Sequence, residues 1–392
     1  MSRLAWVTAD RQIAVAEADG SGGRRLTAAV ARGVGAWSQL AKPQVLWSWP
    51  TWSPDRQWVA AFAVEASDDR SGPARVVALS ADGLRETHWG EFPQDLPIYL
   101  QWHPHNRGLG VLTQRNQELV LSAIAEGRLG RARAVEAGVP LFFNWSPDGE
   151  RILVHAGDRG AAGGRMVLRD PFGGAEDVLF TAQPGSFCAP IFVGPEAVWA
   201  RRAEAASEVV ASTREGGEPR RLLARDGLLA LVPAPVGRPL LAVAHAAAGE
   251  GSPYTELVVV DVITGEVRLL AAPPCLAFFW SPDARWLLVA QVASADNCLR
   301  WWKVPADGSA PIPLATFWPT REMVFLLHFF DQFTGSHPLV SSEGRHLAFA
   351  GYPAGDGQAD LSAPPCIFLK DVDRPDAPAE EVDGGSFAVF SS

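Results

Sequence analysis

The sequence predicts an all-β fold: a single β-propeller domain over residues 1–392, with eight four-stranded blades and seven as the alternative. Three observations predict it. A Trp-Ser-Pro-Asp turn recurs along the chain, its copies are 40 to 60 residues apart, and the two ends of the chain carry complementary apolar strands. A repeat period of this size is typical of solenoids and propellers. Helical periodicity is convincing nowhere, which favours strands throughout.

The best copy of the turn lies within Phe142–Ala156, where an apolar run ends at Trp145 and resumes after Glu150. Pro147 presets φ for a turn, Asp148 can accept hydrogen bonds from nearby amides, and a glycine follows that tolerates positive φ. The stretch therefore predicts a hairpin. A lone hairpin buries little, so it needs neighbours on its faces.

The turn recurs with decreasing fidelity. Near copies, a degraded copy and weaker echoes lie at Trp52–Asp55, Trp280–Asp283, Trp102–His105, Val193–Glu196, Pro233–Val236, Val340–Glu343 and Phe390–Ser392. These make eight units of about 49 residues each. Each unit continues with two further apolar runs joined by a short turn, as in a four-stranded propeller blade. The runs are almost continuously apolar, which is typical of sheets covered on both faces.

The two ends of the chain complete one unit. Leu4–Val7, Ile13–Glu17 and Arg24–Thr27 read as the last three strands of a blade that lacks its first. Ser386–Phe390 reads as that missing innermost strand. We therefore expect the C-terminal strand to join the N-terminal blade, which leaves no free sheet edge there.

The composition excludes some classes of partner and indicates the cellular compartment. The chain has 34 basic and 44 acidic residues, for a net charge of −10, which argues against nucleic acid or an anionic membrane as partner. No apolar run reaches the roughly 18 residues of a membrane span, and the first residues do not resemble a signal peptide. We expect a cytoplasmic protein without membrane insertion. The scattered cysteines, predicted to be buried free thiols, are Cys188, Cys275, Cys298 and Cys366.

The uneven connections indicate which end of the propeller binds. With strands lettered A to D from the channel outward, the A–B and C–D turns are short and share one end. The B–C and D–A connections share the other end, and the long ones are Ala29–Val45, Glu65–Ala74, Gly157–Gly164, Ala246–Tyr254, Trp318–Met323 and Tyr352–Pro365. Long loops on a rigid scaffold are where binding usually occurs.

The Trp-Ser-Pro-Asp turns resemble those of the TolB-like propeller repeat family, strongly at three places and weakly over most of the chain. The resemblance implies a propeller that serves protein–protein contact; some relatives are substrate-gating domains of serine peptidases. It also implies a structural role for the motif residues Trp52, Asp55, Trp102, Trp145, Asp148, Trp280 and Asp283.

The strongest departure from the repeat is the aromatic stretch Phe325–Phe333. It reads as an extended inner strand with its connection, or else as an aromatic platform at the channel mouth. Aromatic and Arg side chains are favoured interface anchors. The candidate contacts for a partner or ligand are Trp37, Arg159, Tyr254, Trp318, Arg321, His328, Asp331 and Tyr352.

Two groups have metal-ligand chemistry but weak patterns. His103 and His105 can be two ligands, but they replace Ser and Asp of the turn and are better explained as a turn variant. The acidic run from Asp371 to Asp383 does not match the spacing of a calcium loop, and a solvated hairpin is the simpler interpretation. We expect no metal and no cofactor.

Enzyme signatures are thin. The sequence has no Gly-x-Ser-x-Gly elbow, no dinucleotide or phosphate-binding Gly loop and no His-Glu-x-x-His. The sequence therefore favours a non-enzymatic scaffold that binds a protein through its long-loop end. The alternatives are a hydrolase or lyase, or a small-ligand or sugar sensor, with a site over the central channel.

Overall fold

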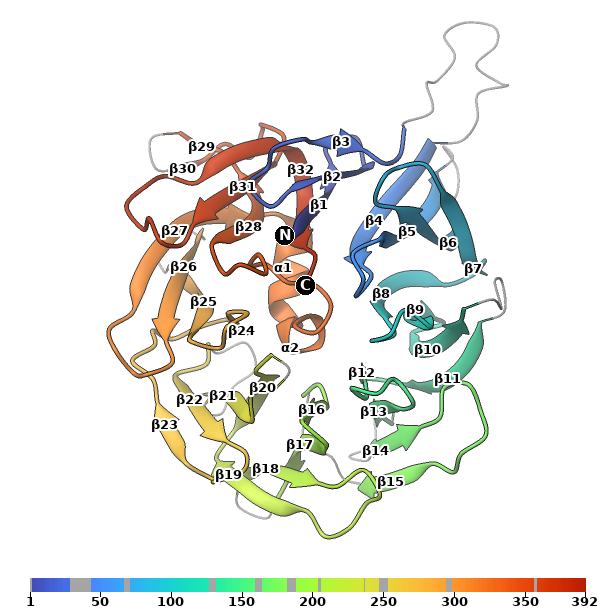
Figure 1. Cartoon of the computed structure of the whole chain (residues 1–392), viewed down its shortest axis with the longest axis vertical. Coiled ribbons are helices and arrows are strands. Elements are labelled where there is room, and N and C mark those ends of the chain that lie inside the picture. The colour runs from blue at the N-terminus through green and yellow to red at the C-terminus, as the bar shows by residue number, and fades with distance from the viewer. Residues whose placement is uncertain are drawn as a thin grey trace, which may run out of the picture.

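The computed structural model describes residues 2–28, 44–66, 71–126, 132–158, 164–181, 188–203, 206–235, 237–246, 253–293, 298–355 and 358–392. Figure 1 shows sheets arranged in a ring, each with its first strand near the centre and its last strand on the rim. The fold is an all-β propeller, as the recurring turns predict. Trp37 and Arg159, two of the candidate contacts, lie outside the described residues.

Five antiparallel sheets in the described part of the chain have four strands each. The first consists of β4 (Gln44–Trp52), β5 (Trp58–Ala66), β6 (Ser71–Ser80) and β7 (Glu86–Phe92). The second consists of β8 (Leu96–Trp102), β9 (Gly108–Arg115), β10 (Glu118–Ala125) and β11 (Arg133–Gly138). The third consists of β12 (Leu141–Trp145), β13 (Ile152–Gly157), β14 (Gly164–Arg169) and β15 (Val178–Thr181). The other two are β16 (Ile191–Val193), β17 (Glu196–Arg202), β18 (Ser207–Ser212) and β19 (Arg220–Arg225); and β20 (Leu228–Pro233), β21 (Leu240–Ala246), β22 (Glu256–Asp261) and β23 (Val267–Leu269).

A sixth sheet has ten strands and contains both ends of the described chain. Its order is β24 (Ala277–Trp280), β25 (Trp286–Ala293), β26 (Cys298–Pro305), β27 (Ile312–Pro319), β28 (His346–Tyr352), β31 (Cys366–Asp371), β32 (Glu380–Phe390), β1 (Arg3–Thr8), β2 (Ile13–Glu17) and β3 (Arg24–Arg25). A small hairpin, β29 (Ala354–Gly355) with β30 (Gln358–Ala359), follows β28. Because this sheet is continuous, the strand pairing does not divide it into separate blades. The number of eight blades therefore stays a prediction.

The long strand β32 pairs with two different partners. Its first half pairs with β31, and its second half pairs with β1, where Leu4 faces Phe390 and Val7 faces Phe387. The amide of Ser391 also donates to the carbonyl of Arg3. The predicted joining of the C-terminal strand to the opening strands is therefore confirmed.

The recurring turns have the predicted chemistry. The Ser146 hydroxyl donates to Asp148 at 2.6 Å, and Gly149 has φ 73°. The Ser281 hydroxyl likewise donates to Asp283, at 2.7 Å. The Trp side chains of the four clearest turns are all buried: Trp52, Trp102, Trp145 and Trp280.

Two of these Trp side chains tie neighbouring sheets together. The Trp102 indole donates to the carbonyl of Thr51 at 2.9 Å, and the Trp280 indole donates to the carbonyl of Val232 at 3.0 Å. Each acceptor lies on the inner strand of the preceding sheet. The motif therefore holds a turn together and also holds that turn against its neighbour.

The expectation of an extended strand over Phe325–Phe333 is wrong. This segment lies in two short helices, α1 (Arg321–His328) and α2 (Phe330–Phe333), inside the ring (Figure 1). Thr320 caps α1 by accepting a hydrogen bond from the Met323 amide, as helix N-cap residues commonly do. Helices this short give little periodic signal, and a run of aromatic residues suits a strand equally well.

Candidate functional site

The centre of the ring is filled by the segment 320–337, which contains α1 and α2. Gln332 binds the inner strand β12 in the way a neighbouring strand would. Its side-chain oxygen accepts from the Phe143 amide at 2.8 Å, and its nitrogen donates to the Phe143 carbonyl at 2.7 Å. The Tyr99 hydroxyl, from β8, donates to the Gln332 carbonyl at 3.1 Å. The segment is thereby anchored to inner strands of two adjacent sheets.

Aromatic packing completes the filling. Trp49 of β4 contacts Phe325, Phe333 and Phe387, with ring centroids 4.7 to 5.3 Å apart. On the opposite side of the segment, Phe330 packs against Phe278 of β24 at 4.8 Å. Such offset and edge-to-face pairs are favourable beyond the area that they bury. The described residues thus line the axis with packed side chains.

Asp331 is the one carboxylate buried in this filling among the described residues. It accepts from the Ala189 amide at 2.7 Å and from the Gln332 amide at 3.0 Å. Burial raises its pKa to about 6, and the two amide hydrogen bonds offset part of this shift. The thiol of Cys188 and the phenol of Tyr254 lie near enough for the Asp331 charge to raise their pKa values further, beyond the effect of their own burial.

The outer side of α1 faces away from the packed centre. Met323, Leu326 and Leu327 are buried, whereas Arg321 and His328 are exposed and Val324 is 47% exposed. Phe325 and Phe329 are half-buried beside them. We call the group Arg321, Val324, Phe325, His328 and Phe329 the α1 face.

The α1 face lies at the long-loop end of the propeller, because α1 directly follows the D strand β27. Glu322 forms an ion pair at 2.5 Å with Arg11, and Arg11 lies in the B–C turn between β1 and β2. Arg11 is also 3.3 Å from the Ser386 hydroxyl. The Thr320 hydroxyl donates to the Ser386 carbonyl at 2.7 Å. These contacts fix the start of α1 against the strand that joins the chain ends.

The structure brings some of the predicted contact residues together. Trp318 and Tyr352 are cross-strand partners where β27 meets β28, directly before α1. Tyr254 pairs through its backbone with Cys275 and packs edge-on against Phe330 at 6.1 Å. Arg321 and His328 lie on the α1 face. Asp331, by contrast, is buried with its carboxylate hydrogen-bonded inside the protein.

His103 has the role of a turn residue. Its Nδ1 accepts from the His105 amide at 2.9 Å, so at the position of the turn Ser it accepts from a backbone amide of the turn, as the Ser146 hydroxyl does from the Arg151 amide. The ring is buried 4.9 Å from that of Trp145, and burial lowers the pKa of His103 to about 4. Over the described ranges, no three His, Cys, Asp or Glu side chains are grouped so that they could hold a metal ion.

The acidic run forms the connection between β31 and β32, which is the predicted hairpin. A lysine occupies its interior. The buried Lys370 ammonium donates to the carbonyls of Arg374 and Pro375, both at 2.8 Å, and to that of Ala377. Asp371 accepts from the Arg345 guanidinium at 3.0 Å. The chain's own cation therefore occupies the ring of carbonyls in this loop.

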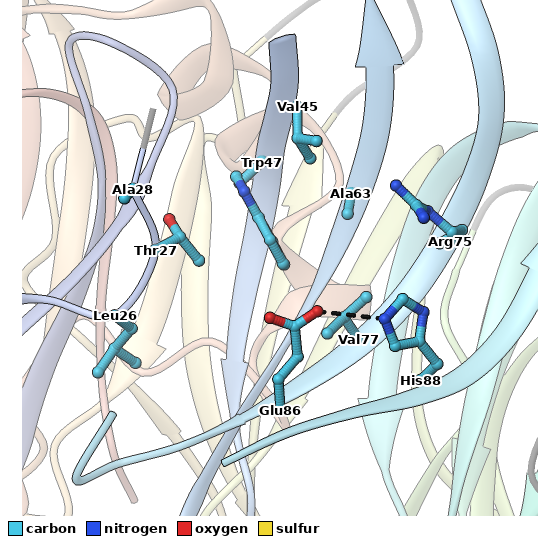
Figure 2. Close-up of a pocket in the computed structure, with 10 residues that line it drawn as sticks. All are labelled: Leu26, Thr27, Ala28, Val45, Trp47, Ala63, Arg75, Val77, Glu86 and His88. Atoms are coloured by element: carbon cyan, nitrogen blue, oxygen red, sulfur yellow. Dashed lines mark ion pairs between the residues drawn. The ribbon is translucent and has the colours of Figure 1, made fainter. Parts of the chain in front are cut away.

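One pocket was not predicted from the sequence. It lies between residues 26–28, which follow β3, and one face of the β4–β7 sheet (Figure 2), and its volume is about 310 Å³. Its polar side chains include Arg75, Glu86 and His88, with His88 Nε2 3.2 Å from a Glu86 oxygen. No short sequence motif marks it, because its residues come from five separate segments.

In the part of the chain that the structure describes, no helix has both the length and the apolar character needed to cross a membrane. The four cysteines are buried free thiols, as predicted.

No family model matches the sequence, and no curated protein matches it. Solved structures do. A prolyl endopeptidase matches with a TM-score of 0.57 at 13% identity over 89% of this chain and 50% of its own. The propeller domain of the Trilobed protease from Pyrococcus furiosus matches with a TM-score of 0.52 at 10% identity over 88% and 99%.

TolB from Acinetobacter baumannii also matches, with a TM-score of 0.43 at 15% identity over 78% of this chain and 62% of TolB. The chain thus spans half to three-fifths of the length of the prolyl endopeptidase and of TolB. At these identities the likenesses bear on the fold alone. The β-propeller fold that the Trp-Ser-Pro-Asp turns predict is the fold of this chain.

Proposed function

We propose that this chain is a non-enzymatic binding module that docks a protein partner on its long-loop end, through the α1 face. The observation that carries the proposal is the two-sided character of α1. One side is locked into the ring by buried apolar residues, and the other presents Arg321, Val324 and His328 to solvent. Interface cores combine apolar and aromatic area with Arg in this way.

Other exposed apolar side chains lie at the same end of their strands. Leu96 begins the inner strand β8 and is 61% exposed, Val292 lies near the end of β25 and is 48% exposed, and Leu361 lies in a B–C connection and is 70% exposed. Together with Val324 they place several exposed apolar side chains at the long-loop end. A rigid helix at the centre keeps the entropic cost of docking low.

A site over the channel, for a hydrolase, a lyase or a sugar sensor, has less support. Several polar groups at the axis are already engaged within the protein. His337, for example, lies 3.1 Å from the Thr51 hydroxyl and 2.7 Å from the Ser336 hydroxyl. Burial lowers the pKa of His337 to about 3, so it stays neutral at ordinary pH. Likeness to the propeller of a prolyl endopeptidase bears only on fold.

The proposed compartment is the cytoplasm. Four free thiols suit a reducing environment, in which disulfides are rare. A net charge of −10 suits a soluble protein whose partner is neither nucleic acid nor an anionic lipid surface.

The test compares two single substitutions in capture from a lysate of the source organism. Val324→Glu places a charge on the α1 face, whereas Leu84→Glu places one on a more exposed aliphatic residue, 83% exposed in a C–D turn at the other end. The proposal predicts a stoichiometric protein captured by the natural chain and by Leu84→Glu, and lost with Val324→Glu. Capture that survives Val324→Glu, or no stoichiometric partner at all, overturns it. Thermal melts of both variants check that the fold is intact.

A further inference from the structure

The pocket in Figure 2 has one wall made by a single face of the β4–β7 sheet. Trp47 pairs across the strands with Ala63, and Ala63 with Arg75, so these three side chains point to the same side. Val77 pairs with His88 one step further along. The opposite wall is the segment 26–28, and the stretch 29–43 that follows it lies outside the described residues.

The hollow exists because the outer strand of the neighbouring blade is short. β3 has only two residues, Arg24–Arg25, and therefore covers little of the sheet beside it. Hydrogen bonds close the space on its inner side, where Gln12 Nε2 donates to the Val45 carbonyl at 3.1 Å and the Trp47 amide donates to the Arg11 carbonyl at 2.9 Å. The Arg24 guanidinium donates to the Ala81 carbonyl. The pocket is thus held by contacts on more than one side.

The charged side chains of the pocket differ in how far their charges are neutralised by a partner. The Arg75 guanidinium is neutralised by Glu65 at 2.6 Å. Glu86 has only His88 as an ion-pair partner among the described residues, and His88 is charged only when protonated. One Glu86 oxygen faces His88, and the other has no hydrogen-bond partner within the described ranges. The pocket therefore carries one carboxylate, that of Glu86, which no Arg or Lys of its lining neutralises.

Apolar surface lies next to that charge. Trp47, Val77 and Leu26 line the same space, and a volume of about 310 Å³ is at the lower end of small-molecule sites. A carboxylate beside an indole and aliphatic side chains suits a positive charge on a small apolar body. An anion would meet the Glu86 carboxylate.

We propose that this inter-blade pocket binds a small organic cation, an amine with a short aromatic or aliphatic body. The ammonium group donates to the free Glu86 oxygen, and the body of the ligand rests against the lining side chains Leu26, Val45 and Trp47. This site is separate from the α1 face, so it does not depend on the proposed docking function.

Three ligands of nearly equal shape test the charge preference: benzylamine, benzyl alcohol and benzoate. Binding is followed by NMR titration at pH 8, where benzylamine is an ammonium. The proposal predicts saturable binding of benzylamine about fivefold tighter than of benzyl alcohol, and still weaker binding of benzoate. Equal or tighter binding of either competitor overturns the proposal. Absence of saturable binding by all three up to about 10 mM also overturns it.

Substitutions then locate the site. Glu86→Gln keeps the shape of an exposed side chain and should abolish the preference for benzylamine over benzyl alcohol. Glu118→Gln removes an exposed carboxylate from β10, away from the pocket, and should leave the preference unchanged. A preference that persists in Glu86→Gln places the binding elsewhere and contradicts the assignment. Both variants alter exposed residues, so unchanged melting curves are expected to accompany them.

Discussion

The ring of sheets and the segment that fills it are built in opposite ways. The ring repeats a local device, a turn whose Ser, Asp and Trp contact residues close by in sequence or on the adjacent sheet. The filling is made once and depends on contacts across the whole chain, such as the two hydrogen bonds between Gln332 and Phe143, which are 189 residues apart. The ring can be predicted from the sequence because its motif is repeated, whereas the filling segment occurs once and has no repeated motif. Three pairs of substitutions test this contrast.

The largest expected effect is in the ring. Trp280→Ala removes a buried indole and its hydrogen bond to Val232, and we expect it to lower the free energy of unfolding by about 3–5 kcal/mol. Chemical denaturation measures the change. Trp280→Phe, which keeps an aromatic ring but loses the donor, should cost clearly less. Equal losses for the two variants would show that packing matters less here than the inter-sheet hydrogen bond.

The next effect is in the filling, and it depends on pH. The pKa of Asp331 is raised from 3.8 to about 6, so the folded protein holds this proton more tightly than the unfolded chain does. Below pH 3.8, Asp331 therefore does not lower the free energy of unfolding. As the pH rises through 6, ionisation of its buried carboxyl lowers the free energy of unfolding by up to about 3 kcal/mol. We expect Asp331→Asn to stabilise the fold by this amount at pH 8.

Denaturation curves from pH 4 to pH 8 check the sign and the range. The gain from Asp331→Asn should be small at pH 4 and full by pH 7. The matched control is Asp82→Asn, at an exposed C–D turn where the Ser80 hydroxyl and the Leu84 amide lower the pKa. That control should show no gain at high pH. A gain for Asp331→Asn that does not vary with pH would contradict the titration argument.

The smallest effect compares two copies of the repeated turn. Ala284 has φ 58° at the position where Gly149 has φ 73°. A side chain is strained in this left-handed region, so Ala284→Gly should raise the free energy of unfolding by about 0.5–1 kcal/mol. Gly149→Ala should have the opposite sign and be larger, because its Cβ would lie 2.2 Å from the His103 ring. A thermal shift in the same direction for both would refute the comparison.

Local chemistry explains what the sequence could predict. The turns, the strand order and the pairing of Ser386–Phe390 with β1 follow from residue types that sit next to each other or match in apolar pattern. The role of His103 as a turn variant follows in the same way. Arg321 and His328 were predicted as contacts for a partner or ligand from their place beside the aromatic stretch and from the preference for Arg and aromatic side chains at interfaces.

What could not be predicted depends on packing between distant segments. The helices α1 and α2 have eight and four residues, too few for a periodic pattern to separate them from a strand. Asp331 was predicted to contact a partner or ligand. The structure buries it because its carboxylate accepts a hydrogen bond from the distant Ala189 amide. The pocket at Glu86 arises because β3 ends at Arg25, two residues earlier than the strand Arg24–Thr27 expected from the apolar pattern.

The central segment also has a consequence for the order of folding. Trp49 and Tyr99 are synthesised long before residues 320–337, yet their aromatic rings lie against Phe333 of that segment. Until the last fifth of the chain leaves the ribosome, the nascent ring has an apolar hole at its axis. Such a surface is the kind that chaperones recognise, and its closure can come only late in biosynthesis.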